Sequence, residues 1–143
     1  WFARSTYGVS LTRPQALLEA YGTGCAGQAG VPIADANGLP ISGSSSFRLL
    51  VSQARPTSVA LLFGSLDAAS LPLLPSSCTL LLDAPISLGF ALTTAAGTGS
   101  LPMPLPFGFN GVSLYFQWVV IDATGAYADF ATFSNGLRTQ LGN

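Results

Sequence analysis

Polar and apolar residues alternate along much of this chain, in short runs bounded by Gly, Pro, Ser and Asn. The clearest run is Val112–Asp122, in which every second residue is large and apolar. Its two predicted faces are Leu114, Phe116, Trp118 and Val120 on one side, and Ser113, Tyr115, Gln117 and Val119 on the other. A period of two is typical of a β-strand, and the apolar face predicts packing in a core.

Further runs rich in β-branched and large apolar residues predict additional strands. They are Phe47–Ala54, Val59–Leu66, Cys78–Asp83, Ile86–Thr93, Tyr127–Phe133 and Leu137–Leu141. We expect a turn at 55–58 between the first two, and a second pair across Ala84-Pro85. Short strands spaced by about 8–12 residues predict an all-β fold, an antiparallel β-sandwich or jelly-roll-like single domain.

Turn and proline signals refine this outline. The Asn-Gly pairs at 37–38, 110–111 and 135–136 predict tight turns with positive φ. Proline alternates with apolar residues in Leu101–Pro106. Because proline cannot donate a hydrogen bond to a central ladder, this segment is expected to be an extended edge whose apolar side chains pack inward.

Few residues of the chain carry charge. Only 8% are charged, against about 25% in a typical soluble domain, although 49% are hydrophobic. The absence of Lys and His excludes a Ser-His-Asp triad, a Walker A loop and histidine metal ligands. Five scattered Arg are too few to neutralise a nucleic-acid backbone. We therefore expect a protein that is not an enzyme, with no cofactor, no metal site and no nucleic-acid partner.

The aspartates fall mostly at predicted strand ends and turns, where Asp caps backbone groups. They are Asp35, Asp67, Asp83, Asp122 and Asp129. An acid pair for glycoside hydrolysis and a calcium site are the alternatives, although the chain has no D-x-D-x-D loop.

Cys25 and Cys78 are the only cysteines. They allow one intramolecular disulfide, and the alternatives are two buried thiols or bridges between chains. We favour the disulfide, and hence an oxidising compartment. The most apolar region, Leu71–Ala96, is interrupted by Pro and Asp, so no membrane-spanning helix is expected.

Several short motifs occur in a fixed order between residues 21 and 141. They are the glycine-rich stretch 21–32 around Cys25, Gly43 before the run at 47–51, the apolar run with Gly-Ser at 59–65, Cys78, G-S-L-P-x-P at 99–104, Q-W at 117–118 followed by Asp122, and S-N-G-L at 134–137. The set resembles an uncharacterised secreted β-domain of planctomycete and myxobacterial extracellular proteins. This resemblance implies a bacterial β-domain outside the cell or at its surface, with a Cys25–Cys78 bridge, and it implies no activity.

Residues 1–20 lie outside the resemblance, and we treat them as an N-terminal extension of a β-sandwich domain at 21–143. Arg13–Ala20 is the only helix candidate, with Thr12 as its N-cap. The apolar residues before it include Phe2, Tyr7, Val9 and Leu11, of which the last three alternate with Gly8 and Ser10. They fit a first strand of the same sandwich, a donor strand that pairs with the next subunit, or a disordered leader. A start at Trp1 fits a trimmed fragment and a mature processed chain equally well.

The scarcity of charge favours self-assembly, because soluble β-proteins guard their sheet edges with charges, especially Lys. We expect a non-enzymatic, secreted subunit of an extracellular filament, pilus-like fibre or surface layer, whose partner is a second copy of itself. In this prediction Phe2, Tyr7, Val9 and Leu11 form the donor strand. The alternative is a carbohydrate-binding or adhesion module with glycans as partners, and Tyr115 and Gln117 on its ligand face.

Overall fold

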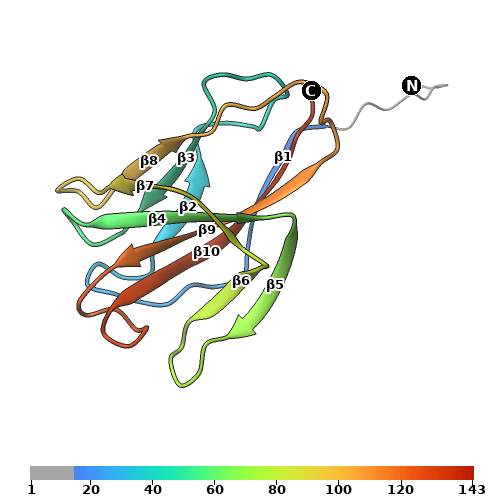
Figure 1. Ribbon diagram of the computed structural model, residues 1–143. Coiled ribbons are helices and arrows are strands. Elements are labelled where there is room, and N and C mark those ends of the chain that lie inside the picture. Colours follow the sequence, from blue (N-terminus) through green and yellow to red (C-terminus); the bar gives the residue numbers. More distant parts are fainter. Residues whose placement is uncertain (1–14) are drawn as a thin grey trace.

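The computed structural model describes residues 15–143, which form ten β-strands and no helix (Figure 1). The strands are β1 Leu17–Tyr21, β2 Ile33–Ala36, β3 Arg48–Ser52, β4 Val59–Ser65, β5 Asp67–Pro72, β6 Thr79–Asp83, β7 Ile86–Leu92, β8 Gly99–Pro102, β9 Ser113–Ile121 and β10 Ala131–Gln140. The described fold is therefore all-β, and its sheets pair in antiparallel fashion, as predicted.

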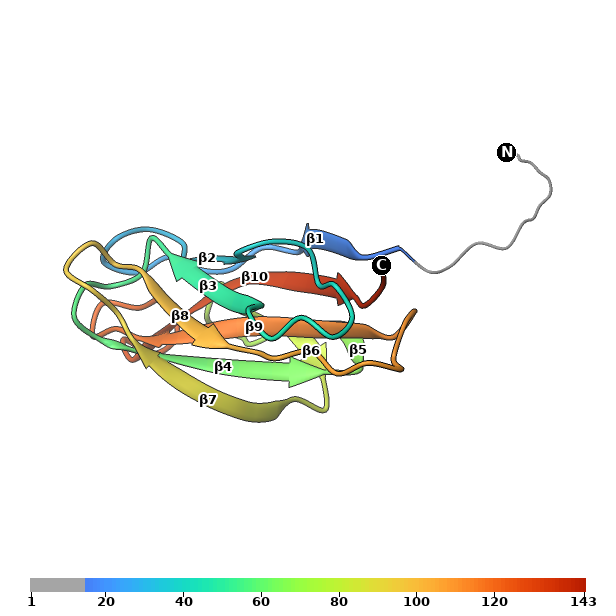
Figure 2. The ribbon, with the colours of Figure 1, turned by 90° about the horizontal axis from the view of Figure 1, so that it is seen from above.

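The strands form a sandwich of unequal layers (Figure 2). The larger sheet has the order β1-β10-β9-β4-β7, and the smaller one has the order β2-β3-β8. Between them lies one core, in which Phe116, Trp118 and Val120 of β9 pack with Leu49 and Val51 of β3. The predicted inner face of β9 is confirmed.

Strands β4 to β7 form one long antiparallel arm that bends in the middle. Its register runs from Gly64↔Ile86 in the main sheet to Asp67↔Asp83 in the β5–β6 hairpin. The bend places Ala84 at φ 47°, a backbone conformation that is strained for a residue with a Cβ. In Figure 1 the hairpin lies below the larger sheet, on the side away from β3 and β8, and it packs on β9 and β10.

A buried glutamine holds the hairpin against the main sheet. Gln117 is fully buried, and its Oε1 accepts a hydrogen bond from the Leu81 N–H at 3.0 Å. Its Nε2 donates to the carbonyl oxygens of Thr79 at 3.0 Å and Ser134 at 2.9 Å. One side chain thereby links β6, β9 and β10.

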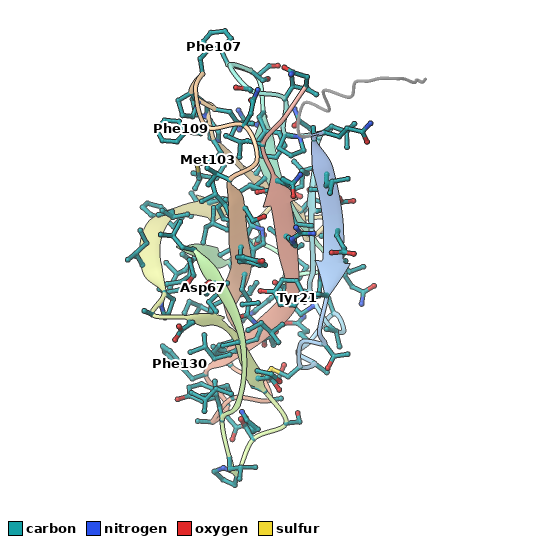
Figure 3. The ribbon with its side chains drawn as sticks, turned by 90° about the vertical axis from the view of Figure 1, so that its right-hand side faces the viewer. Tyr21, Asp67, Met103, Phe107, Phe109 and Phe130 are labelled. Carbon is teal, nitrogen blue, oxygen red and sulfur yellow. A yellow bond between two sulfur atoms is a disulfide. The ribbon has the colours of Figure 1, made fainter. Side chains whose placement is uncertain are left out.

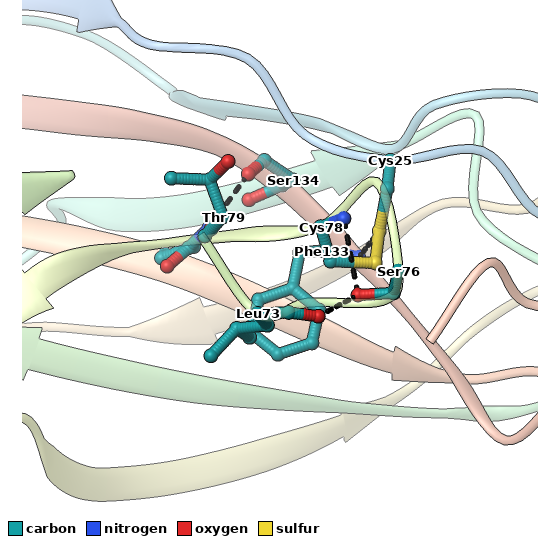
Figure 4. The surroundings of a disulfide bond; sticks show 8 residues. Cys25, Leu73, Ser76, Cys78, Thr79, Phe133 and Ser134 are labelled. Atoms are coloured by element: carbon teal, nitrogen blue, oxygen red, sulfur yellow. Dashed lines mark hydrogen bonds between the residues drawn. A yellow bond between two sulfur atoms is a disulfide. The ribbon is translucent and has the colours of Figure 1, made fainter. Parts of the chain in front are cut away.

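The tip of the hairpin is held by a disulfide (Figure 4). Cys78 is bonded to Cys25, and their Cα atoms are 4.9 Å apart. Closing a loop with a sequence separation of 53 contributes about 4 kcal/mol in the chain-entropy account. Phe133 packs beside the bridge, and its N–H points to Cys25 Sγ at 3.3 Å. The predicted bridge is confirmed.

The S-N-G-L segment is a bulge inside β10, and not a turn. Ladder pairing shifts between Phe133 and Gly136, and Ser134 Oγ accepts the Trp118 N–H at 2.9 Å in place of a backbone carbonyl. Asn135 Oδ1 accepts the Ala34 N–H at 2.8 Å, which ties β10 to β2 of the smaller sheet. Gly136 lies directly against the Tyr21 ring, where a Cβ would be 2.3 Å from Tyr21 Cζ.

Several local predictions are wrong. The expected helix at Arg13–Ala20 overlaps Leu17–Tyr21, which is an edge strand paired with β10. The domain boundary predicted after residue 20 falls within this strand. The runs at 127–133 and 137–141 are largely one strand, β10. Of the three Asn-Gly pairs, only 110–111 has a positive φ, at Gly111. The expected edge at 101–106 is confirmed in part, because β8 is an edge strand and Leu105 is buried.

The pairing of the arm also differs from the prediction. The runs at 78–83 and 86–93 were expected to pair with each other, but β6 pairs with β5 and β7 pairs with β4. Ala84-Pro85 is the bend of the arm and not a hairpin turn.

Replacing Gln117 with Leu is expected to lower the free energy of unfolding by about 3 kcal/mol, because three buried backbone groups lose their partner. Urea unfolding measures this loss. In the matched variant Gln140→Leu, at the half-buried end of β10, we expect a loss of at most about 1 kcal/mol. Equal losses in the two variants would contradict a special role for Gln117.

Candidate functional site: an apolar groove beside strand β7

A groove of about 390 Å³ opens where the larger sheet extends beyond the smaller one. Its floor is the inner face of the larger sheet, and Met103, which follows β8, forms one wall. The lining residues are Gly64, Ser65, Leu66, Asp67, Asp83, Ala84, Ile86, Leu88, Met103, Leu114 and Phe116. The volume lies within the range of about 300–1,000 Å³ that is common for binding pockets.

A glycine keeps the floor of the groove open. Gly64 is at an inner-facing position of β4, opposite Phe116 of β9. A Cβ at this position would be 2.6 Å from Leu88 Cδ1 and 3.4 Å from Phe116 Cε1. Any larger residue would therefore push Leu88 or fill the groove.

A β-bulge directs Leu88 into the groove. Leu62 pairs with Gly89, and Phe63 pairs with Ser87, which leaves Leu88 as an extra residue in β7. A bulge turns a side chain that simple alternation would place on the other face. Leu88 accordingly packs against the core cluster beside Phe116.

The mouth of the groove is acidic. Asp67 and Asp83 are direct cross-strand partners at the base of the β5–β6 hairpin, and both residues line the groove. Like charges in directly opposite positions destabilise a strand pair. Within residues 15–143 neither carboxylate forms an ion pair, since the salt bridge found there joins Arg138 to Glu19 at 3.4 Å. Figure 3 shows Asp67 and Met103 on the same side of the molecule, with Met103 nearer to Phe107 and Phe109.

The strand beside the groove is an edge without charge or proline. β7 ends the larger sheet, and its sequence ISLGFAL lacks these two usual protections of an edge strand, although it carries the bulge at Leu88. Ile86, Phe90 and Leu92 on this strand are exposed. At the opposite edge, β1 carries Glu19 in its ion pair with Arg138. An apolar groove next to an open strand edge is suited to receive one more strand.

The two residues of the predicted ligand face, Tyr115 and Gln117, differ in their burial. Gln117 is fully buried under the hairpin, so its prediction as a ligand contact is wrong. Tyr115 is half-buried, and its ring meets that of Tyr21 edge-on at 5.8 Å between centroids. The Tyr21 hydroxyl donates to the Leu81 carbonyl oxygen, and burial, with a smaller effect from Tyr115, raises the pKa of Tyr21 to about 12.

The predicted donor residues Phe2, Tyr7, Val9 and Leu11 lie outside the described residues. The sequence itself shows that residues 1–14 and residues 15–143 differ in the sign of their net charge. Residues 1–14 contain Arg4 and Arg13 and no acid, which leaves three Arg and six acids in residues 15–143. A basic segment thus precedes an acidic body.

Asp122 acts as a cap, as the sequence suggested for the aspartates. It is buried, and its Oδ2 accepts the Gln28 N–H at 2.8 Å. Its Oδ1 accepts the N–H and the hydroxyl of Thr124, both at 2.9 Å. Burial favours the neutral acid, but these hydrogen bonds and the charge of Arg55 outweigh it and hold the pKa of Asp122 below its usual value.

A scan against protein-family models finds no match, and no curated protein is significantly similar in sequence. Residues 15–143 contain no cluster of three or more His, Cys, Asp or Glu that could hold a metal ion. Nor does this part of the chain form a helix long and apolar enough to cross a membrane. The site must be interpreted from its own geometry.

Sequence reasoning missed the groove and its acidic mouth. Gly64 and the Asp67/Asp83 pair were visible in the sequence, but their proximity depends on the bend of the arm. Only the continuing register of β4–β5 against β6–β7 brings them together.

Replacing Asp122 with Asn is expected to cost about 1–2 kcal/mol of stability at neutral pH, because charge-assisted hydrogen bonds are lost. The pKa of Asp122 is lower in the folded chain, so its contribution is present above about pH 4 and disappears as pH falls through the folded value. Urea unfolding of both proteins from about pH 7 down to about pH 2.5 measures this. A difference that is constant over this range would contradict the role of the carboxylate.

Proposed function

We propose that this protein is a non-enzymatic structural subunit that assembles with copies of itself outside the cell. In this assembly, residues 1–14 of one copy supply a strand that lies along β7 of the next copy and fills its groove. The observation that carries the proposal is the apolar groove beside an edge strand without charge or proline. The disulfide supports an oxidising, extracytoplasmic location.

The chemistry of the groove favours apolar side chains over a polar ligand. Leu88, Met103, Leu114 and Phe116 line it, and the polar residues of the lining are Ser65, Asp67 and Asp83. Tyr7, Val9 and Leu11 alternate with Gly8 and Ser10, so in an extended strand they share one face. Main-chain hydrogen bonds to β7 would supply affinity, and these three side chains would supply specificity.

The position of β1 favours insertion into a neighbouring copy. β1 and β7 are opposite edges of the same sheet, four strand spacings or about 19 Å apart. Leu17 pairs with Gln140, which pairs with Ser113, and Tyr115 pairs with Ser65 near the groove. The start of β1 is therefore roughly level with the groove of a copy placed beside it.

A donor at one edge and an acceptor at the other make a heterologous contact. Such a contact repeats without closing unless the rotation between subunits forms a ring, and it then generates filaments. The low charge of the chain also lets many copies pack closely with little electrostatic repulsion. These features support a fibre or layer rather than a dimer.

Placing a carboxylate at the groove tests the acceptor. Ile86 is 63% exposed at the groove, and Leu92 is 69% exposed on the same strand but outside it. We expect Ile86→Asp to remain folded but fail to assemble, and Leu92→Asp to assemble like the unmodified chain. Light scattering with negative-stain electron microscopy measures assembly, and circular dichroism checks folding.

The donor has an equivalent matched pair. We expect Val9→Asp to block assembly, whereas Ser10→Asp, one residue along and on the other face of an extended strand, retains it. An unmodified chain that stays monomeric as concentration is raised would refute the proposed function. Equal behaviour within either pair would refute docking in the groove.

A further inference from the structure

We propose that Arg13 of the incoming segment binds between Asp67 and Asp83 of the receiving copy, and that this contact sets the register and direction of the added strand. The inference rests on the proposed function and specifies its interface. Its basis is charge complementarity between the acidic mouth of the groove and the basic first 14 residues.

The acidic pair calls for a cation from outside the described body. Asp67 and Asp83 face each other across the hairpin without an ion pair among residues 15–143. None of the three Arg among residues 15–143 forms an ion pair with Asp67 or Asp83. Arg48 donates to Ser100, Arg138 pairs with Glu19, and Arg55 acts on Asp122. A planar guanidinium, with five donors, can bind two carboxylates at once.

The spacing of the N-terminal residues selects Arg13 over Arg4. Arg13 continues the series Tyr7, Val9 and Leu11 at intervals of two, so an extended strand places all four on one face. Arg4 falls on the opposite parity. With Arg13 at the acidic mouth, Leu11, Val9 and Tyr7 follow in order along β7, away from the base of the hairpin.

This placement defines the direction of the donor strand and limits the distance between neighbouring subunits. The donor strand runs with its C-terminal end at the base of the β5–β6 hairpin. Only residues 14–16 separate Arg13 from β1 of the donating copy. The four Cα–Cα steps from Arg13 to Leu17 span at most about 14 Å, so the β1 edge of one body lies close to the hairpin base of the next.

Complementary charge reversal tests the contact in the full-length chain. Arg13→Glu alone, and Asp67→Lys with Asp83→Asn alone, are each expected to raise the critical concentration for assembly about tenfold or more, because like charges then meet. An equimolar mixture of the two variants offers each acidic donor a basic acceptor and each basic donor an acidic acceptor. We expect the mixture to assemble at a concentration close to that of the unmodified chain.

Two matched variants separate a specific contact from a change of net charge. Arg4→Glu alters the same segment on the other parity, and Asp35→Lys alters an exposed acid of β2. Both are expected to assemble normally. A chelator is also expected to have no effect, since an arginine and not a divalent cation occupies the pair.

The outcomes distinguish this inference from the proposed function. Normal assembly of Arg13→Glu, a mixture that fails to recover, an equal loss in the matched variants, or dissolution by the chelator would each overturn the role of Arg13. All four results presuppose that the unmodified chain assembles, so they leave the proposed function intact. Failure of the unmodified chain to assemble overturns the proposed function itself.

Discussion

The buried amide of Gln117 is the interaction on which the shape of this protein depends. Its three hydrogen bonds attach the β5–β6 hairpin to β9 and β10. The register of the arm β4–β5 against β6–β7 passes through the bend unchanged, so the bend is held by contacts of the hairpin with the rest of the sheet, of which Gln117 makes two and the Tyr21 hydroxyl makes one. The groove lies at this bend, because Ser65 and Leu66 on one side of the arm and Asp83 and Ala84 on the other line it.

Around this amide the chain uses polar side chains in place of backbone ladder bonds. Ser134 replaces a ladder acceptor for Trp118, and Asn135 connects the two sheets through Ala34. Buried polar groups of this kind are stable only when all of them are paired. In residues 15–143 the one buried side-chain oxygen or nitrogen without a partner is Thr132 Oγ1. The motifs Q-W and S-N-G-L are thus the two halves of one hydrogen-bonding network.

Sequence reasoning succeeded where a single strand determines the outcome. The inner face of β9 follows from its period of two, and the bridge is the favoured one of the alternatives that two cysteines allow. Sequence reasoning failed where a contact with a distant segment of the chain decides the structure. Gln117 has the parity of a solvent-facing residue, but a hairpin from about 40 positions earlier covers it. Leu17–Tyr21 contains good helix formers, but pairing with β10 along five residues overrides that propensity.

The Asn-Gly pair at 135–136 failed for a related reason. Such a pair is a strong turn signal when its side chains are free to face solvent. Here Asn135 is needed to bond with Ala34 across the sandwich, and Gly136 is needed because the Tyr21 ring lies against it. Both residues are specified by tertiary contacts, which no local window of sequence contains.

The groove and the strained bend both lower the stability of an isolated subunit. Ala84 holds a left-handed conformation at the mouth, Gly64 leaves the floor unfilled, and two carboxylates face each other across the hairpin base. Each feature destabilises an isolated body, and natural structures retain such costs mainly at functional positions. An added strand would cover the apolar floor, at about 25 cal/mol for each Å² removed from water, and a cation on that strand would neutralise the acidic pair. One occupant, carrying apolar residues at alternate positions and a terminal arginine, resolves both defects together, whereas a purely apolar ligand would leave the acidic pair unpaired.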